Sequence, residues 1–206
     1  MAQHLDGLAA IFPFEPKFYA DTTLPVEFVG HPFVAPDYVA PVKFDPTGPV
    51  LLLPGSRVGA VRKIFPAVLA GFVQSGATEG AVIYPSEAIR AELAAAHPPV
   101  NVRLVATGHP VAASAVLTSS GTMSMHCALA GIPGALTYRT DALTYALGRM
   151  LVNVEFIGIA NLLLNEPMYP EFIQGAATPE ALAAELETDI DNCIERHVHM
   201  GSDSDE

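Results

Sequence analysis

One long stretch of this chain, from Pro110 to Tyr138, contains no aspartate, glutamate, lysine or arginine. A membrane span would need about 20 mostly apolar residues in succession, and polar and helix-breaking residues interrupt this stretch too often for that. Uncharged sequence is also expected where parallel β-strands are covered on both faces. We therefore predict two buried strands here, at 115–118 and 135–138, separated by a polar loop and a helix over 123–130.

The same alternation of short apolar runs and helical patterns continues through most of the chain. Apolar runs bounded by turn residues predict further strands at 50–53, 81–84, 102–105 and 155–157. Helical spacing predicts helices over 58–72, 86–96 and 141–151, and a last helix beginning at Thr178-Pro179. Pro66 predicts a kink in the first of these helices or a later start. Strands that alternate with helices in this way are typical of an α/β fold with a doubly wound, mostly parallel, Rossmann-like sheet.

Residues 1–45 differ from the rest because prolines recur throughout them. This density predicts an extended connection that packs on a neighbour, with short strands at 8–12 and 26–29. We expect the Rossmann-like domain to cover residues 46–195. The acidic segment 196–206 is expected to be a disordered, solvated tail, and an acidic interaction tail is the alternative interpretation.

The charge is distributed unevenly along the chain. The formal net charge is −12, and residues 180–206 contain nine acidic residues against one basic residue. A nucleic-acid partner would require a basic face, which this sequence does not supply, so we expect none. Two cysteines, Cys127 and Cys193, and a start without a signal-peptide pattern predict a reducing, cytoplasmic compartment. Cys193, His197 and His199 have no fourth metal ligand close in sequence, so we predict neither a metal nor a cofactor.

Two polar loops each follow a predicted strand. Gly55-Ser56-Arg57 comes shortly after strand 50–53, and Ser120-Gly121-Thr122 comes after strand 115–118. Ligands of doubly wound folds bind beyond the carboxyl ends of the strands. Glycine and hydroxyl residues at a helix start can present backbone N–H groups to an anion, and Arg57 can add a charge-assisted contact. The pair predicts a phosphate-bearing ligand, although neither loop matches a P-loop or a dinucleotide fingerprint.

Several motifs resemble, in their order along the chain, those of the lipid-A-disaccharide synthase family. They are Phe12-Pro13-Phe14-Glu15-Pro16-Lys17-Phe18-Tyr19, Phe28-Val29-Gly30-His31-Pro32, Leu53-Pro54-Gly55-Ser56-Arg57, Ser120-Gly121-Thr122, Asn161-Leu162-Leu163 and Pro170-Glu171-Phe172-Ile173-Gln174. The resemblance spans roughly residues 8–190. It implies the C-terminal, donor-binding half of an inverting glycosyltransferase of GT-B type, which has two facing Rossmann-like halves. The implied reaction joins a diacylglucosamine unit, supplied as UDP-2,3-diacylglucosamine, to a second acylated glucosamine phosphate.

The resemblance also implies a set of residues that contact the UDP-sugar. They are Gly55, Ser56, Arg57, Ser120, Gly121, Thr122, His126, Asn161, Glu171 and Gln174, with His31 at the crossover between the halves. The family pattern has a glutamate at the position of His126. That carboxylate typically accepts hydrogen bonds from both ribose hydroxyls, whereas a neutral imidazole has one acceptor.

The match covers only the family's C-terminal half, so we expect a truncated chain or one half of a split enzyme. The expected partners are an N-terminal-half polypeptide or a second copy of this chain, and peripheral association with the inner face of the inner membrane. The catalytic base would lie on the other half. Two alternatives stay open at this point: a non-catalytic interaction or nucleotide-binding module, and a UDP-N-acetylglucosamine 2-epimerase, which also needs two facing halves.

Overall fold

The computed structural model of the chain describes residues 4–141 and 155–202, with side chains described as far as residue 192. The chain divides into two compact units, Met1–Ala40 and Pro41–Glu206. The boundary falls before residue 45 because strand β3 (Val42–Phe44) pairs with β7 (Val111–Ala113) in the larger unit.

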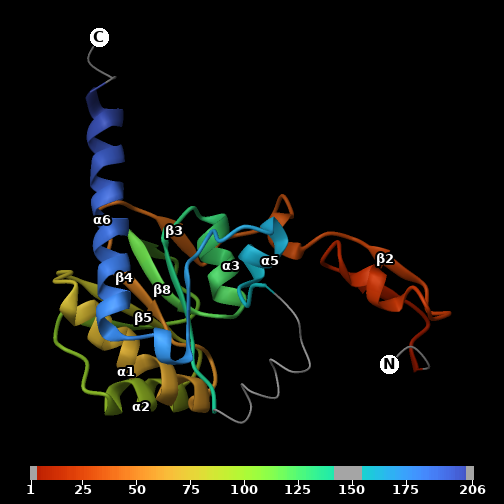
Figure 1. The fold of residues 1–206 in the computed structure, drawn as a ribbon, viewed down its shortest axis with the longest axis horizontal. Coiled ribbons are helices and arrows are strands. Elements are labelled where there is room, and N and C mark those ends of the chain that lie inside the picture. Colours follow the sequence, from red (N-terminus) through yellow and green to blue (C-terminus); the bar gives the residue numbers. More distant parts are fainter. Residues whose placement is uncertain (1–3, 142–154, 203–206) are drawn as a thin grey trace. The chain divides into compact units, whose positions relative to one another are not determined.

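A six-stranded parallel sheet forms the centre of the larger unit (Figure 1). Its strands lie in the order β10-β9-β8-β4-β5-β6. Their bounds are β4 (Val50–Leu53), β5 (Gly80–Tyr84), β6 (Val102–Ala106), β8 (Ala115–Ser119), β9 (Gly134–Tyr138) and β10 (Glu171–Ile173). Counted along the chain, the six strands follow the order 3-2-1-4-5-6 of doubly wound nucleotide-binding folds. The predicted fold class is confirmed.

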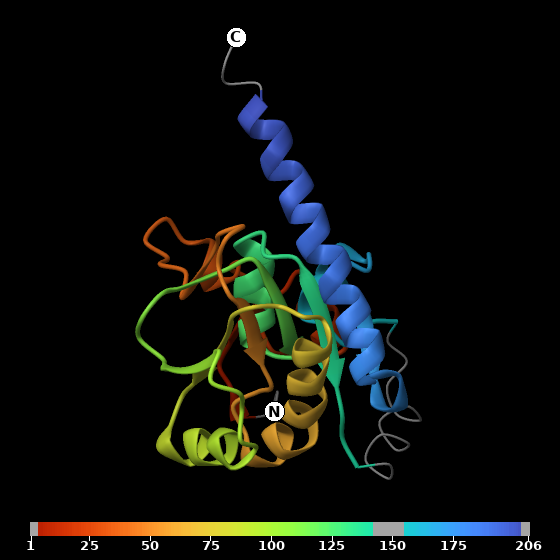
Figure 2. The same ribbon diagram turned by 90° about the vertical axis from the view of Figure 1, so that its left-hand side faces the viewer.

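Helices cover both faces of this sheet (Figures 1 and 2). They are α1 (Val58–Gln74), α2 (Glu87–Ala95), α3 (Thr122–Leu129), α5 (Ile159–Leu164) and α6 (Pro179–Ser202). The chain winds outward from β4 in one direction through α1 and α2, then in the other through α3. Because crossovers between parallel strands are right-handed, this reversal places α3 on the opposite face from α1 and α2.

Alternate side chains of each strand enter two separate cores. Val50 and Leu52 of β4 pack in one core with Phe65 and Phe72 of α1. Leu51 of β4 packs in the other core, which includes Cys127 of α3, Tyr169, and residues of the small β3–β7 sheet. Both faces of the central strands are therefore buried, which explains why the sequence around them carries no charge.

Several predicted elements have the expected bounds and one predicted strand is wrong. Strand β4 covers 50–53 as predicted, and the side chain of Ser86 caps α2 as expected. Helix α1 begins at Val58 with Pro66 exposed in its interior, so of the two alternatives for Pro66 the later start does not occur. The predicted strand at 155–157 does not form, because the N–H of Ile157 donates to the carboxylate of Glu171 instead of to a neighbouring strand. The predicted helix 141–151 lies outside the described residues, apart from Asp141.

The smaller unit has little interior of its own. Its strands β1 (Leu8–Ala10) and β2 (Val26–Phe28) form a two-stranded parallel sheet, with short 3-10 helices at Glu15–Tyr19 and Pro32–Val34. Among its described residues, Ala10 and Leu24 are the buried apolar side chains. Stacked and edge-on contacts link the rings of Phe12, Phe14, Phe18, His31, Phe33 and Tyr38.

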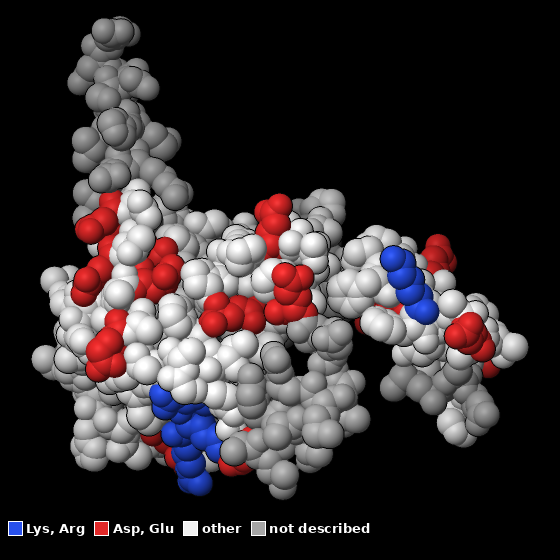
Figure 3. Space-filling model, in the orientation of Figure 1, with Lys and Arg blue, Asp and Glu red and all other residues white. Residues whose placement is uncertain are grey.

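Helix α6 carries the acidic end of the sequence. Acidic side chains lie along its described part (Figure 3). The helix continues to Ser202, past the boundary expected at residue 195, and residues 203–206 of the expected tail lie outside the described residues. None of the described helices combines the length and apolar character that crossing a bilayer requires.

Candidate functional site

A cavity of about 490 Å³ lies at the carboxyl ends of the parallel strands. The segments that line it follow β4, β5, β6, β8 and β9. Strands β4 and β8 are neighbours in the sheet, joined in register through Leu53 and Thr118, and the chain's winding reverses between them. This is the position at which doubly wound folds open a crevice for ligands.

The two polar loops predicted from the sequence meet in this cavity. Gly55, Ser56 and Arg57 line it from the loop after β4, and Ser120, Gly121 and Thr122 line it from the end of β8 and the start of α3. Gly55 has a φ of +112°, a conformation that favours glycine, so the turn after β4 depends on this residue.

Two helices begin at the cavity without a side-chain cap. Arg57 is the N-cap of α1 and Gly121 is the N-cap of α3, and neither residue has a side-chain acceptor to cap its helix. By contrast, Ser86 Oγ accepts from Ile89 N at 3.4 Å in α2, and Thr178 Oγ1 accepts from Ala181 N in α6. The first N–H groups of a helix have no intrahelical partner and attract negative charge. The cavity therefore joins two helix starts that are suited to bind an anion.

The backbone at both helix starts is open to close approach. A Cβ atom added at Gly59 or at Gly121 would meet no protein atom within 4 Å. The φ of Gly121 is 170°, which is extended backbone that any residue can adopt. Neither the packing nor the backbone conformation thus requires glycine at position 121. A ligand that approaches the backbone closely at this position would require a residue without a side chain.

Among the described residues, three basic side chains line the cavity, namely Arg57, Lys63 and Arg139. Arg57 is exposed and takes part in none of the ion pairs found among the described side chains. Lys63 Nζ lies 2.5 Å from Asp141 Oδ2. The guanidinium of Arg139 donates to the carbonyl oxygen of Ala177. The site is therefore cationic although the chain as a whole is acidic.

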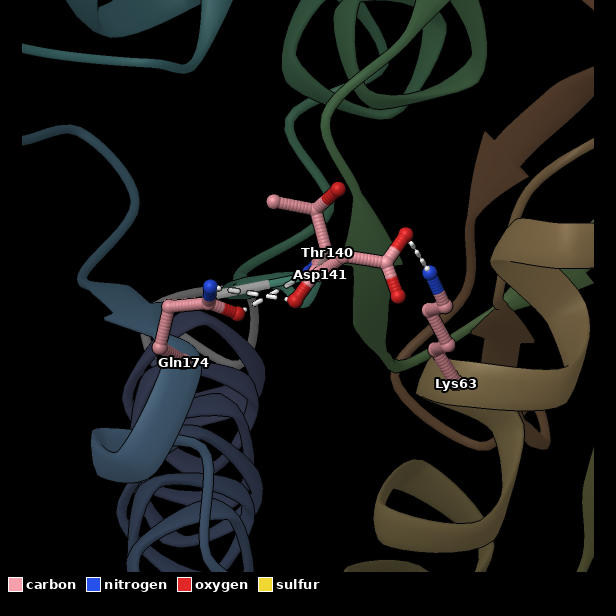
Figure 4. A network of polar contacts seen from close by, with 4 residues as sticks. All are labelled: Lys63, Thr140, Asp141 and Gln174. Atoms are coloured by element: carbon pink, nitrogen blue, oxygen red, sulfur yellow. Dashed lines mark hydrogen bonds and ion pairs between the residues drawn. The ribbon is translucent and has the colours of Figure 1, made fainter. Parts of the chain in front are cut away.

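Gln174 fixes the segment that follows β9 (Figure 4). Thr140 N donates to Gln174 Oε1 at 2.9 Å, and Gln174 Nε2 donates to the Thr140 carbonyl at 3.1 Å. Gln174 has a φ of +53°, which is uncommon for a residue other than glycine. Gln174, predicted to contact the UDP-sugar, is thus outside the cavity lining and instead holds Thr140, which lines it.

Asn161 and Glu171 form a polar cluster outside the cavity lining. Asn161 is fully buried; its Nδ2 donates to Tyr169 O at 2.7 Å and to Glu171 Oε1 at 2.9 Å, and its Oδ1 accepts from Tyr169 N. The carboxylate of Glu171 also accepts from the backbone N–H groups of Ile157 and Gly158. The cluster touches the cavity rim through Ser120, whose Oγ donates to the Ile157 carbonyl at 3.0 Å.

The two histidines of the predicted site belong to different units of the chain. His126 is half-buried on α3, four residues after Thr122, and is not among the residues that line the cavity. His31 belongs to the smaller unit, where its Nδ1 accepts from Phe33 N at 3.2 Å. Among the described residues no group of three or more His, Cys, Asp or Glu side chains is arranged to hold a metal ion. The side chains of Cys193, His197 and His199 lie outside the described part of the chain.

The cavity-lining residues that sequence reasoning missed include Gly59, Lys63, Arg139 and Thr140. Arg139 and Thr140 directly follow a predicted strand, so the rule that selected the other two loops would also have selected them. Gly59 and Lys63 are four residues apart on α1, a spacing that places both on one face of a helix.

Comparisons with known proteins point to one family. The family model described as lipid-A-disaccharide synthetase matches residues 1–203. A lipid-A-disaccharide synthase of Geobacter metallireducens is 33% identical over 221 residues, covering 94% of this chain and 55% of the relative. The synthase of Syntrophus aciditrophicus is 37% identical over 204 residues, covering 88% and 52%, and that of Coxiella burnetii is 33% identical over 202 residues, covering 89% and 53%. The chain thus spans about half the length of these relatives.

Proposed function

The chain belongs to the lipid-A-disaccharide synthetase family, and from this premise we propose that its cavity binds the diphosphate of a UDP-sugar, UDP-2,3-diacylglucosamine. The observation that carries the proposal is the meeting of two uncapped helix starts, α1 and α3, beside the exposed Arg57. Backbone N–H groups and a guanidinium together match the oxygen atoms of a diphosphate.

The same groups would act during transfer of the sugar. When the bond between the sugar and the diphosphate breaks, negative charge develops on the departing phosphate oxygen. N–H groups at the starts of α1 and α3 would stabilise such charge, and the exposed Arg57 would add a charge-assisted contact to it. The proton of the acceptor hydroxyl must go to a base within hydrogen-bond reach, which we place on the other half of the family fold.

His126 is the residue we assign to the ribose. It follows Thr122 by four residues, so it lies on the same face of α3 one turn further from the helix start. A nucleoside attached to a diphosphate at Thr122 would extend along this face. An imidazole there can accept one hydrogen bond from the ribose hydroxyls.

We assign a protein partner to the smaller unit. Strands β1 and β2 are three residues each and form a two-stranded parallel sheet, whereas parallel sheets are normally larger and covered on both faces. We propose that an N-terminal half of the family fold, or a second copy of this chain, packs on this unit and supplies the acceptor site. Because the proposed donor carries acyl chains, we place the domain peripherally at the inner face of the inner membrane.

A calorimetric titration with UDP tests the proposed site. Replacement of Arg57 by alanine should weaken UDP binding by about 1.5–3 kcal/mol, since hydrogen bonds to charged groups fall in that range. The matched control is Arg62→Ala, because Arg62 lies on the same helix outside the cavity lining and pairs with Glu92. This control should change the affinity less than about twofold.

The absence of UDP binding by the unmodified chain at millimolar concentration would favour the alternative of a non-catalytic module. Equal affinity in the Arg57 and Arg62 variants would remove Arg57 from the site. The substitution of histidine for the family glutamate at His126 is the sequence feature that favours this alternative.

A further inference from the structure

Lys63 lines the cavity, and its ammonium group forms an ion pair with Asp141 of the same chain. It lies on α1 one turn after Gly59, and both residues line the cavity. Its side chain is therefore on the cavity side of the helix whose start we assign to the diphosphate. A lysine carries its ammonium group on a flexible four-carbon chain, which allows the charge to move between neighbouring acceptors.

Asp141 holds that ammonium group at the edge of the cavity. The distance between Lys63 Nζ and Asp141 Oδ2 is 2.5 Å, and the side chains are 38% and 69% exposed. Asp141 is not among the residues that line the cavity. The residue before it, Thr140, is held by Gln174, whose side-chain amide bonds both the N–H and the carbonyl of Thr140 (Figure 4).

We propose that Lys63 is a second cationic contact for the phosphates of the ligand, and that Asp141 competes with those phosphates for it. The inference rests on the proposed function, since it concerns the same cavity. An exposed ion pair contributes little to stability, so exchanging it is easy. A diphosphate brings at least two negative charges to the ammonium group, against one on the carboxylate. Asp141 thereby lowers the affinity of the cavity for diphosphates.

Calorimetric titrations with inorganic pyrophosphate, UDP and uridine test the competition. Asp141→Asn should bind pyrophosphate and UDP about two- to fivefold more tightly, in line with the strength of an exposed ion pair. Lys63→Met should weaken both ligands by a similar factor. Uridine, which has no phosphate, should bind all variants equally. Asp141 is exposed and Lys63 is half-buried, and melting temperatures would verify that the variants are folded.

A double variant separates competition from a general effect of charge. In the Lys63→Met background, Asp141→Asn should give no further gain, because the ammonium group that it would release is gone. The same gain in both backgrounds would overturn the proposal. A second control is Glu92→Gln, which releases Arg62 on the same helix but outside the cavity lining and should leave both affinities unchanged.

The results also separate this inference from the proposed function. If the unmodified chain binds UDP and Arg57→Ala weakens it, while Asp141→Asn changes nothing, the competition is wrong and the donor site stands. If the unmodified chain binds neither UDP nor pyrophosphate at millimolar concentration, the proposed function fails and this inference fails with it.

Discussion

Asn161 is fully buried, and both the nitrogen and the oxygen of its side-chain amide form hydrogen bonds within the chain, with Tyr169 and Glu171 as partners. A family motif drew attention to this residue as a ligand contact. In the structure its hydrogen bonds fix the segment between α5 and β10. We expect its effect on the cavity to be indirect, through Glu171, the Ile157 loop and the hydroxyl of Ser120.

Replacement of Asn161 by alanine should therefore lower stability. The change leaves the N–H and the carbonyl of Tyr169 without their side-chain partner and removes one of three hydrogen bonds to Glu171 Oε1, which should cost about 2–3 kcal/mol. For a protein of this size, thermal unfolding should then shift by roughly 4–12 °C. The control is Asn192→Ala, an exposed asparagine on α6, which should shift it by less than about 2 °C. Loss of UDP binding with an unchanged melting temperature would instead place Asn161 in the site.

For His126, which we assign to the ribose, the expected effect of substitution is a change in UDP affinity. His126→Glu should tighten binding of UDP about five- to twentyfold, because a carboxylate can accept from both ribose hydroxyls. Binding of inorganic pyrophosphate should not improve. A large fall in melting temperature without a gain in affinity would show that the half-buried histidine is a packing residue of α3, because a buried glutamate without partners is costly.

At the scale of elements, the central strands were predictable because each is a short apolar run bounded by turn residues. The same logic located the cavity, since the loops after β4 and β8 had to meet once both strands entered one parallel sheet. Strands β3, β7 and β10 have three residues each, too few to show a periodic pattern. Helix α5 is a single short element of six residues and was missed for the same reason.

Contacts between residues far apart in the chain could not be predicted from the sequence. The pair of Lys63 and Asp141 joins residues 78 positions apart, and Gln174 reaches Thr140 across 34 positions. No local pattern marks such pairs. The predicted strand at 155–157 failed because a side chain, Glu171, satisfies that backbone where a neighbouring strand was expected. The sequence also could not show which motif residues line the cavity and which lie outside its lining. Only the structure separates these two groups.

At the scale of the whole molecule, the smaller unit exposes apolar side chains that a folded chain normally covers. Phe18 is 76% exposed, and Val34 and Val39 are 67% and 80% exposed. Exposed apolar patches of a few hundred Å² mark interaction surfaces. We therefore expect this chain to associate with a partner or with itself through Met1–Ala40.

Light scattering at tens of micromolar should give a mass above that of one chain, or a dye specific for apolar surfaces should bind to the monomer. Phe18→Ser should reduce whichever signal is seen. Val100→Ser is the control, because Val100 is fully exposed in the larger unit. A monomer that binds no dye would refute the expected interface.

The central claim is that the starts of α1 and α3 together hold the diphosphate of UDP, and backbone amide spectra test it most directly. Titration of isotope-labelled chain with UDP should shift the amide resonances of Val58, Gly59, Thr122 and Met123 more than any others, because these N–H groups would gain phosphate acceptors. Pyrophosphate should shift the same resonances. Largest shifts on the outer faces of α2 and α6, or no shifts at several millimolar UDP, would contradict the account.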